Sequence, residues 1–411
     1  MKGVSDSVCT QTTGASVEIM IGPDEYRIGW APPYKRAADA TDTHLKALTD
    51  EVLATFKAIE RIIIHRTKSV HLDPEDGNAQ LIELARLGRR AYQRFFKDEA
   101  ARQQLSDRFQ EIEQEAVVPA PTFISDSVPF PWEVLYEGDD YHTGDSSKFW
   151  GFAYSPARII NLRRYRTYPK KQTLPSDMLF CLHHKLQLAH RQEWPEIERL
   201  VKITPRDRFY LLGQLSGSQV SDGEAFLGYL DQSNHNMLHF ACHCRPCSID
   251  SDSLLVSLLN EEGIEVNPQV IELETNTFTD IEGSFQRQPL VFLNACQSAG
   301  GSDEWRKTFN LPSAFIERGA AAIIATACPV PDIFAAAFAK VFYEFFLRGQ
   351  KVTDLGTGKT TYRLMTIGEA LRATRWYFLR EHNNPLGLAY GLYSPTFYQL
   401  EQPLIQGGSL Q

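Results

Sequence analysis

The stretch QPLVFLNACQSAG, residues 288–300, decides the fold class of this chain. Its apolar run Leu290–Leu293 follows Pro289 and ends abruptly in small and polar residues around Cys296. A short run of branched and aromatic residues is typical of a fully buried strand in a parallel sheet. In open α/β sheets, ligands and chemistry gather beyond the carboxyl ends of the strands. The stretch therefore predicts an α/β fold with a thiol at that edge, where it is either a small buried hydrophobe or a nucleophile.

The second half of the chain alternates strands and helices around this stretch. Four further apolar runs predict strands over residues 178–184, 208–213, 237–241 and 320–330. Helical patterns lie between and after them, over residues 192–202, 222–230, 312–318 and 333–348. Five strands interleaved with helices imply a three-layer α/β/α fold with a mostly parallel central sheet.

The first half predicts a different organisation. Residues 16–21 predict one strand, and an apolar stripe over residues 45–64 predicts a helix. Two more helices follow the break at Asp73-Pro74, and strand and turn patterns begin at Pro119. The segment KKQTLP, which ends at Pro175, is typical of a linker. We therefore expect an N-terminal α+β flanking domain over residues 1–175, with a degenerate companion sheet as one description of it, and a second domain over residues 176–411.

Bulk composition narrows the class of protein. The formal net charge is −9, and no run of Lys or Arg offsets it, which argues against a nucleic-acid partner. No window approaches the ~18 unbroken apolar residues of a membrane span, and the first twenty residues lack the apolar core of a signal peptide. Seven cysteines, three of them within residues 242–247, do not resemble a secreted disulfide framework. A cytoplasmic location with reduced thiols fits these features.

Two neighbouring strands of the predicted sheet end in reactive side chains. The strand over residues 237–241 leads to His243, and the strand over residues 290–293 leads to Cys296, 53 residues later. If these strands are adjacent, at the usual spacing of ~4.8 Å, both side chains leave the same edge of the sheet. An imidazole beside a thiol lowers the thiol pKa and then protonates the leaving amine, as a cysteine protease requires.

The strings LHFACHC around His243 and LVFLNACQSAG around Cys296 resemble the CHAT family of caspase-like peptidases, which is grouped with caspases, separases and gingipains. The resemblance covers roughly residues 178–403. It implies that Cys296 is the nucleophile, that His243 is the base, and that the backbone N–H groups of Cys296 and of the residue after His243 form the oxyanion hole. Family members commonly have glycine at that last position, where this chain has Cys244. Glycine's conformational freedom is absent there, so the oxyanion geometry is the weak point.

The resemblance further implies a cytosolic cysteine endopeptidase that needs no metal and no organic cofactor. Family members often act in prokaryotic defence, including antiviral defence, or in programmed cell death, and cleave one dedicated protein. We therefore expect a protein substrate and an activating or inhibiting protein partner. A competing class remains open, namely a catalytically inactive scaffold that keeps the fold and binds another protein through its sheet edge.

Other polar residues have two interpretations each. The set Cys242, His243, Cys244 and Cys247 offers four potential zinc ligands, although structural zinc sites usually pair two separated knuckles. Asp332 is either an acid of the P1 pocket, selecting Arg or Lys, or a helix N-cap, and we favour the cap.

Asp250 and Asp252 are comparable candidates at the rim of the substrate pocket. Glu133 is either a functional buried acid or, as we favour, a rim carboxylate paired with Arg158, Arg163 or Arg164. The string GTGKT at residues 356–360 lacks the first glycine of a phosphate-binding loop, so it predicts the N-terminus of a helix over residues 361–380.

Overall fold

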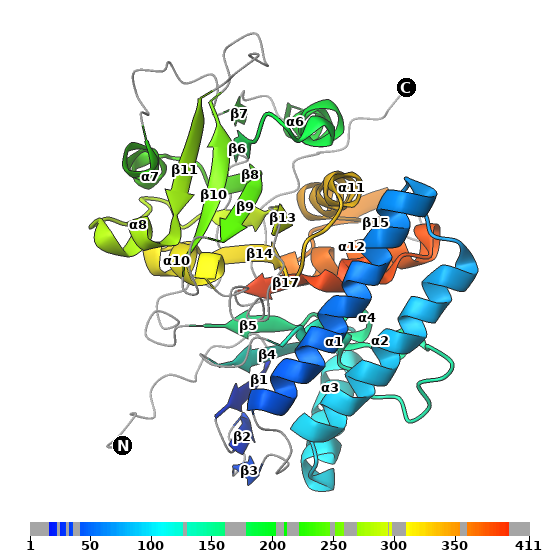
Figure 1. Cartoon of the computed structure of the whole chain (residues 1–411). Helices are drawn as coiled ribbons and strands as arrows, with labels where there is room; N and C mark the ends of the chain where they lie inside the picture. The colour runs from blue at the N-terminus through cyan, green and yellow to red at the C-terminus, as the bar shows by residue number, and fades with distance from the viewer. Residues whose placement is uncertain are drawn as a thin grey trace, which may run out of the picture.

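One large sheet organises the molecule, shown in Figure 1 as a computed structural model. The structure describes residues 16–22, 25–29, 33–35, 42–125, 130–160, 178–202, 209–211, 222–246, 251–258, 269–294, 296–297, 310–353 and 360–393. The strands of this sheet are β1 (Ser16–Ile21), β2 (Glu25–Ile28), β3 (Tyr34–Lys35), β4 (Ala120–Ile124), β5 (Ala157–Ile159), β6 (Met178–Leu182), β7 (Phe209–Leu211), β8 (Met237–Ala241), β12 (Leu290–Leu293), β14 (Ala322–Thr326) and β17 (Tyr390–Tyr393). Their order is β3-β2-β1-β4-β5-β17-β14-β12-β8-β6-β7.

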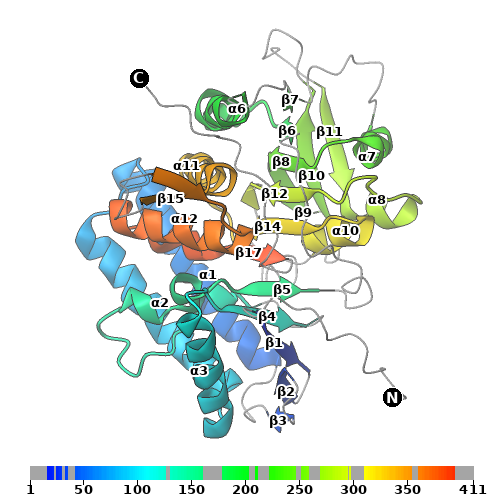
Figure 2. The same cartoon turned by 180° about the vertical axis from the view of Figure 1, so that it is seen from behind.

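The pairing within this sheet is mostly parallel. Only β1–β2, β2–β3 and β14–β17 are antiparallel among its described strand pairs. The strand β17 comes from the end of the described chain, yet it lies between β5 and β14 (Figure 2). It therefore joins the strands of the N-terminal half to those of the C-terminal half in one continuous sheet. The expected boundary at Pro175 falls within residues 161–177, outside the described residues.

Ten α-helices lie within the described residues. They are α1 (Asp42–Arg61), α2 (Pro74–Phe95), α3 (Glu99–Gln114), α4 (Trp150–Ala153), α6 (Trp194–Lys202), α7 (Gly223–Gln232), α8 (Thr275–Asp280), α10 (Asn310–Arg318), α11 (Asp332–Tyr343) and α12 (Ile367–His382). Single π-helical turns extend three of these segments: η1 (Ile62–Thr67), η4 (Ala189–Glu193) and η6 (Glu344–Arg348). Shorter 3₁₀ turns are η2 (Trp132–Val134), η3 (Ser146–Lys148) and η7 (Pro385–Ala389). None of the helices in the described ranges is long and apolar enough to cross a membrane.

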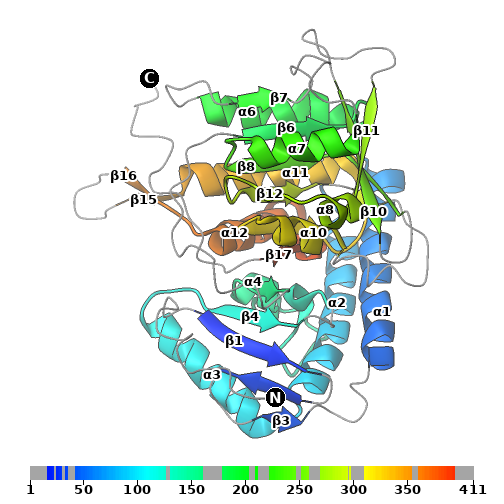
Figure 3. The ribbon, with the colours of Figure 1, turned by 90° about the vertical axis from the view of Figure 1, so that its left-hand side faces the viewer.

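Alternation of side chains along the central strands separates two apolar layers. In β6, Met178, Phe180 and Leu182 belong to a hydrophobic cluster that includes residues of α6, α11 and α12. Leu179 and Cys181 belong to a second cluster that includes residues of α7, α8 and α10. Successive residues of a strand point to opposite faces, so helices cover both faces of this part of the sheet (Figure 3). The predicted three-layer α/β/α class with a mostly parallel sheet is confirmed.

A second, smaller sheet was not predicted. It has the order β11-β10-β9-β13 and is built from β9 (His243–Pro246), β10 (Asp252–Ser257), β11 (Val270–Glu274) and β13 (Cys296–Gln297). Strand β10 is antiparallel to both β9 and β11, whereas β9 and β13 are parallel. This sheet carries both residues of the predicted dyad.

The predicted helix over residues 361–380 is wrong at its start. Residues Thr360–Arg363 form strand β16, which pairs with β15 (Gln350–Thr353) in a hairpin, while residues 354–359 lie outside the described part of the chain. Helix α12 begins only at Ile367, where Thr366 and Glu369 form a reciprocal capping box. The β-branched Thr360 and Thr361 favour a strand, and the capping box supplies the helix start six residues later.

Candidate active site

The backbone brings His243 and Cys296 side by side. In the large sheet β8 and β12 are parallel neighbours, with Phe240 paired to Leu293. The two segments that follow these strands leave the sheet at the same edge and pair again as β9 and β13. There His243 is the register partner of Cys296. The predicted adjacency of the two strands is therefore confirmed. The structure describes the backbone of Cys296 but not its side chain.

His243 lies half-buried against a second histidine. The rings of His243 and His183 meet edge to face with their centroids 4.5 Å apart, and His183 stacks on His184 at the same separation. The backbone N–H of His183 donates to the carbonyl of Ala241 at 2.9 Å, which fixes the end of β6 beside the end of β8. Neither His183 nor His184 was singled out from the sequence, although both lie at the end of a predicted strand, which was a usable signal.

Burial and the Asp332 carboxylate act in opposite directions on the pKa of His243. Burial is the largest effect and lowers the pKa of His243, and Lys185 lowers it further. Asp332 raises that pKa, because its carboxylate stabilises the imidazolium form. The pKa of His183 is lowered to about 4, first by burial and then by repulsion from His243 and the other nearby cations. His183 is therefore neutral at physiological pH, and it presents His243 with an uncharged ring.

A groove of about 520 Å³ opens beside His243. Its other lining residues are Glu60, Ile63, Ile64, Lys68, Leu188, Pro329, Val330, Pro331, Asp332 and Ile333. It therefore combines a mostly apolar lining with two carboxylates and one lysine. His243 and Asp332 share this groove, so an extended chain bound there lies against the predicted base.

The predicted N-cap role of Asp332 is wrong. Pro331 occupies the N-cap position of α11 in an extended conformation, and Asp332 is the first helical residue. Pro331 has φ −61° and ψ 141°, the extended conformation of an N-cap residue, so the cap lies one residue earlier than the acid. Asp332 instead lines the groove that His243 also lines, where an acid can form part of a substrate pocket.

The two other acids behave differently. Asp252 is fully buried at the start of β10, where Asn310 donates to its carboxylate at 3.0 Å and its backbone N–H donates to Thr275 Oγ1 at 3.1 Å. The expected rim position is therefore wrong for Asp252, because these contacts hold it inside the molecule. Asp250 lies outside the described residues.

Cys244 occupies the position where the resemblance led us to expect glycine, and it has the backbone of an ordinary strand residue. It pairs with Leu254 and with Gln297 as a regular residue of β9, and it is buried in the second hydrophobic cluster. Among the described residues, the non-glycine positions with positive φ are Lys68, Ala116 and Asn383, so the backbone at Cys244 needs no glycine.

The zinc alternative receives no support from the direction of the side chains. Cys242 and Cys244 both belong to the second hydrophobic cluster, whereas His243 between them contacts His183. The predicted alternation is observed, and it separates these potential ligands. Within the described ranges no group of three His, Cys, Asp or Glu side chains is placed to hold a metal, and Cys247 lies outside those ranges.

A buried polar network lies directly beneath the segment that carries Cys296. Glu193 Oε1 accepts hydrogen bonds from Asn294 Nδ2 and from His239 Nε2, each at 2.7 Å. Tyr390 Oη donates to Asn294 Oδ1 at 2.8 Å, and Tyr343 Oη lies 3.1 Å from His239 Nδ1. All five residues are buried. The network links η4, β8, β17 and α11 to Asn294, two residues before Cys296.

Glu133 belongs to a different buried cluster. Its carboxylate pairs with Arg158, whose Nη1 lies 2.8 Å away, and with Arg375 at 3.4 Å, and all three side chains are almost completely buried. The predicted pairing with Arg158 is confirmed, but the rim position is wrong, because η2 places Glu133 in the interior. Glu133 therefore has a structural contact rather than a place in the groove.

The CHAT domain family matches residues 86–355, which is more than half of the chain. The chain belongs to the CHAT domain family. The match starts within α2, so the family region of this CHAT chain includes a large part of its N-terminal half. The resemblance seen in the sequence is confirmed.

Individual relatives of this CHAT chain are distant. A protein named probable protease from Vitiosangium sp. (strain GDMCC 1.1324) is 29% identical over 189 residues, which span 46% of this chain but only 22% of that protein. The RgpB pro- and mature domains of Porphyromonas gingivalis align with 10% identity and a TM-score of 0.45, over 75% of this chain and 71% of that one. The separase–securin complex of Saccharomyces cerevisiae aligns with 12% identity and a TM-score of 0.39, over 85% of this chain and 22% of that one.

Proposed function

We propose that this CHAT chain is a cysteine endopeptidase with His243 and Cys296 as its catalytic dyad. The observation that carries the proposal is the register of β9 and β13, in which these two residues are direct partners on adjacent parallel strands. Paired residues of neighbouring strands share a face of the sheet and lie about 5 Å apart, which is within reach of a side-chain hydrogen bond.

The chemistry follows from these positions. His243 takes the proton of the Cys296 thiol, and the thiolate attacks the carbonyl carbon of the scissile peptide bond. The backbone N–H groups of Cys296 and Cys244 stabilise the oxyanion that forms. His243 then gives its proton to the leaving amine, and the acyl group remains on sulfur. A water molecule that loses a proton to His243 hydrolyses the thioester and regenerates the thiol.

Asp332 supports two steps of this mechanism. Its carboxylate raises the pKa of His243, which favours the imidazolium–thiolate pair over the neutral pair. It also lines the groove beside His243, where an acid attracts a basic P1 side chain. We propose a preference for Arg or Lys on this basis.

The proposal extends to the setting of the reaction. A protein substrate follows from endopeptidase activity, and a controlling protein partner, a cytoplasmic location and a role in prokaryotic defence or cell death follow from the family resemblance. The second candidate function is a protein-binding scaffold. The direct pairing of His243 with Cys296 favours the enzyme, because a scaffold has no need of an imidazole and a thiol side by side.

The test combines thiol chemistry with cleavage. Iodoacetamide should modify Cys296 of the wild type well below pH ~8.5, the range of a free cysteine, because the imidazole stabilises the thiolate. His243→Ala should move this reaction to higher pH. Wild type, Cys296→Ala and His243→Ala should then be incubated with the proteins encoded beside this chain, and only the wild type should cleave one of them.

A matched control is Cys181→Ala. Cys181 is fully buried and burial raises its thiol pKa, so its removal should leave the modification of Cys296 unchanged. Equal cleavage by the wild type, Cys296→Ala and His243→Ala would eliminate the dyad and leave the scaffold. Ordinary thiol reactivity of Cys296 in the wild type would have the same consequence.

A further inference from the structure

The end of the first long helix forms one wall of the groove beside His243. Glu60 belongs to α1, Ile63 and Ile64 to the π-helical turn η1, and Lys68 follows that turn. Other lining residues come from around Pro331 at the start of α11. Two segments more than 250 positions apart in sequence therefore line the same groove.

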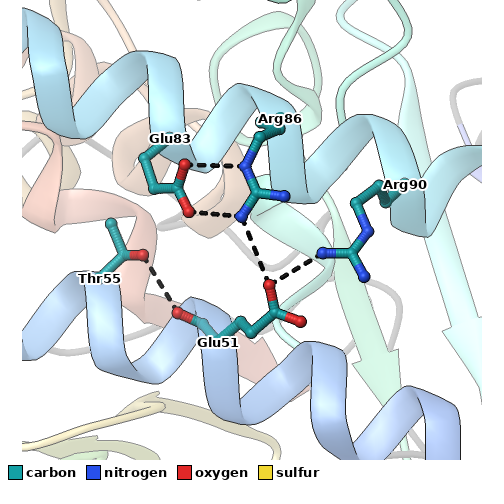
Figure 4. A network of polar contacts seen from close by, with 5 residues as sticks. All are labelled: Glu51, Thr55, Glu83, Arg86 and Arg90. Carbon is teal, nitrogen blue, oxygen red and sulfur yellow. Dashed lines mark hydrogen bonds and ion pairs between the residues drawn. The ribbon is translucent and has the colours of Figure 1, made fainter.

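Helix α1 is held firmly enough to act as a wall. One face of it is buried in the main hydrophobic cluster through Leu45, Leu48, Val52, Phe56 and Ile59. Its outer side is linked to α2 (Figure 4), where Glu51 accepts from Arg90 at 2.8 Å and from Arg86 at 3.4 Å. Those charged side chains are more than a third exposed, so the buried face contributes most of the stability.

The segment after η1 is also held in place. The backbone N–H of Leu72 donates to the carbonyl of His382 at 2.9 Å, and Asn384 Nδ2 donates to the carbonyl of Val70 at 2.8 Å. Gly77, at the start of α2, approaches the carbonyl oxygen of Asn383 so closely that a Cβ atom would lie 2.1 Å from it. Contacts with α1 on one side and with the end of α12 on the other therefore fix η1.

The held segment presents an aliphatic side chain to solvent. Ile64 is 44% exposed, while the adjacent Ile63 is fully buried. A single exposed isoleucine needs no explanation, but this one lines the same groove as His243. Burial raises the pKa of Glu60 above its usual value, although Lys57, Arg61 and His65 act in the opposite direction. An aliphatic surface and a partly buried acid thus lie within the proposed peptidase site.

We propose that Ile64 and Glu60 determine which substrate the groove accepts. The occupant is an extended segment of a protein substrate that packs a bulky aliphatic side chain against Ile64 and keeps acidic side chains away from Glu60. This inference rests on the proposed endopeptidase function, since it places the segment beside the bond that the dyad cleaves. The N-terminal helix is then part of the substrate-recognition surface.

The test uses pools of tetrapeptidyl acyloxymethyl ketones, in which one position is held as Leu, Gly or Asp and the others are randomised. The readout is the rate at which each pool forms an adduct on Cys296. At one position the Leu pool should react about tenfold faster than the Gly pool, since burying such a side chain is worth ~1–3 kcal/mol. Ile64→Asp should abolish this preference, and the readout is the ratio of the Leu-pool rate to the Gly-pool rate, because a new carboxylate beside His243 changes both rates together.

Two further variants sharpen the test. Val117→Asp introduces the same charge at another exposed aliphatic residue, which is 41% exposed and does not line the groove. It should change neither the rates with the pools nor the rate with iodoacetamide. Glu60→Gln keeps the side-chain volume and should reduce the discrimination against the Asp pool several-fold. This variant also covers the case in which Ile64→Asp fails to fold.

The outcomes separate the two proposals. If iodoacetamide modifies Cys296 at low pH but Ile64→Asp and Glu60→Gln leave all pool ratios unchanged, the recognition role is wrong and the peptidase stands. The recognition role is equally wrong if a reactive Cys296 forms no adduct with any pool. If Cys296 shows only ordinary thiol reactivity, the peptidase proposal itself fails.

Discussion

Asn294 is the residue through which the interior contacts the proposed nucleophile. It directly follows β12, two positions before Cys296, and its side-chain amide is held on both sides, by Glu193 and by Tyr390. A buried amide with both its oxygen and its nitrogen engaged resists rotation, because any other orientation leaves a buried group unsatisfied. The segment that carries Cys296 therefore starts from a fixed point.

Two tyrosine variants should distinguish positioning from stability. Tyr390→Phe removes the donor to Asn294, and Tyr343→Phe removes a hydroxyl at the other end of the network, on His239. Each loses one buried hydrogen bond, so both should be destabilised by about 1 kcal/mol in urea unfolding. Only Tyr390→Phe should slow the reaction of Cys296 with iodoacetamide, by several-fold. Equal rates for the two variants would show that the network has no positioning role.

The sequence predicted the dyad but not its support. His243 and Cys296 stand out because each follows an apolar run at a spacing that a known family shares. Glu193 lies 101 residues from Asn294, within a segment whose pattern only indicated a helix. No local pattern reports a contact over that separation, so the network became visible only in the folded chain.

At the scale of elements, a buried charge cluster ties three segments together. Glu133 of η2 contacts Arg158 of β5 and Arg375 of α12, and Arg375 also donates to the carbonyl of Tyr390 at 2.7 Å. Burial lowers the pKa of Arg375 to about 10, which remains high enough to keep it charged. Arg158 and Arg375 thus share one carboxylate in the interior. Removing the charge of Glu133 leaves both arginines without the negative charge that compensates them.

Glu133→Gln should therefore be strongly destabilising. Breaking a buried ion pair by neutralising one partner costs ~3–5 kcal/mol, because an uncompensated charge stays in the interior. The matched control is Glu83→Gln, which removes the same charge from the partly exposed pair with Arg86 and should cost less than about 1 kcal/mol. Urea unfolding of both variants measures the difference, and similar losses would contradict the argument.

Element prediction succeeded where burial alone defines a segment. The strands β6 and β12 are continuous apolar runs, and β8 is apolar except for His239. Helix α7 begins after Asp222, whose side chain accepts from the N–H of Ala225 as an N-cap. The second sheet was missed because β9 and β13 are short and mixed in polarity. Such strands are defined by their pairing partners, and the partner of Cys296 lies 53 positions earlier in the chain.

At the scale of the molecule, one buried and one partly buried histidine make the fold sensitive to acid. Burial lowers the pKa of both His183 and His235 to about 4, whereas an unfolded histidine titrates near ~6.5. Between these values the unfolded chain binds more protons than the folded one. The contribution of these two histidines to the free energy of unfolding should therefore be fully present above pH ~6.5. It should be lost as the pH drops toward 4.

The variant His235→Gln should show this dependence directly. It removes one of the two groups at a position away from the groove, so its stability should decline less than that of the wild type between pH 6.5 and 5. Urea midpoints at several pH values measure the two slopes. Parallel slopes would mean that other groups cause the loss in acid.

The position of β17 has a consequence for synthesis. The ribosome makes the strands β1 to β5 first, but among the described strands they connect to the rest of the sheet only through residues Tyr390–Tyr393, which are made after all the other strands of that sheet. Tyr390, the donor to Asn294, arrives with that strand. A nascent chain that already contains His243 and Cys296 therefore lacks the contact that fixes the segment before the thiol. Assembly of the fold thus delays completion of the site until β17 has been made and has paired with β5 and β14.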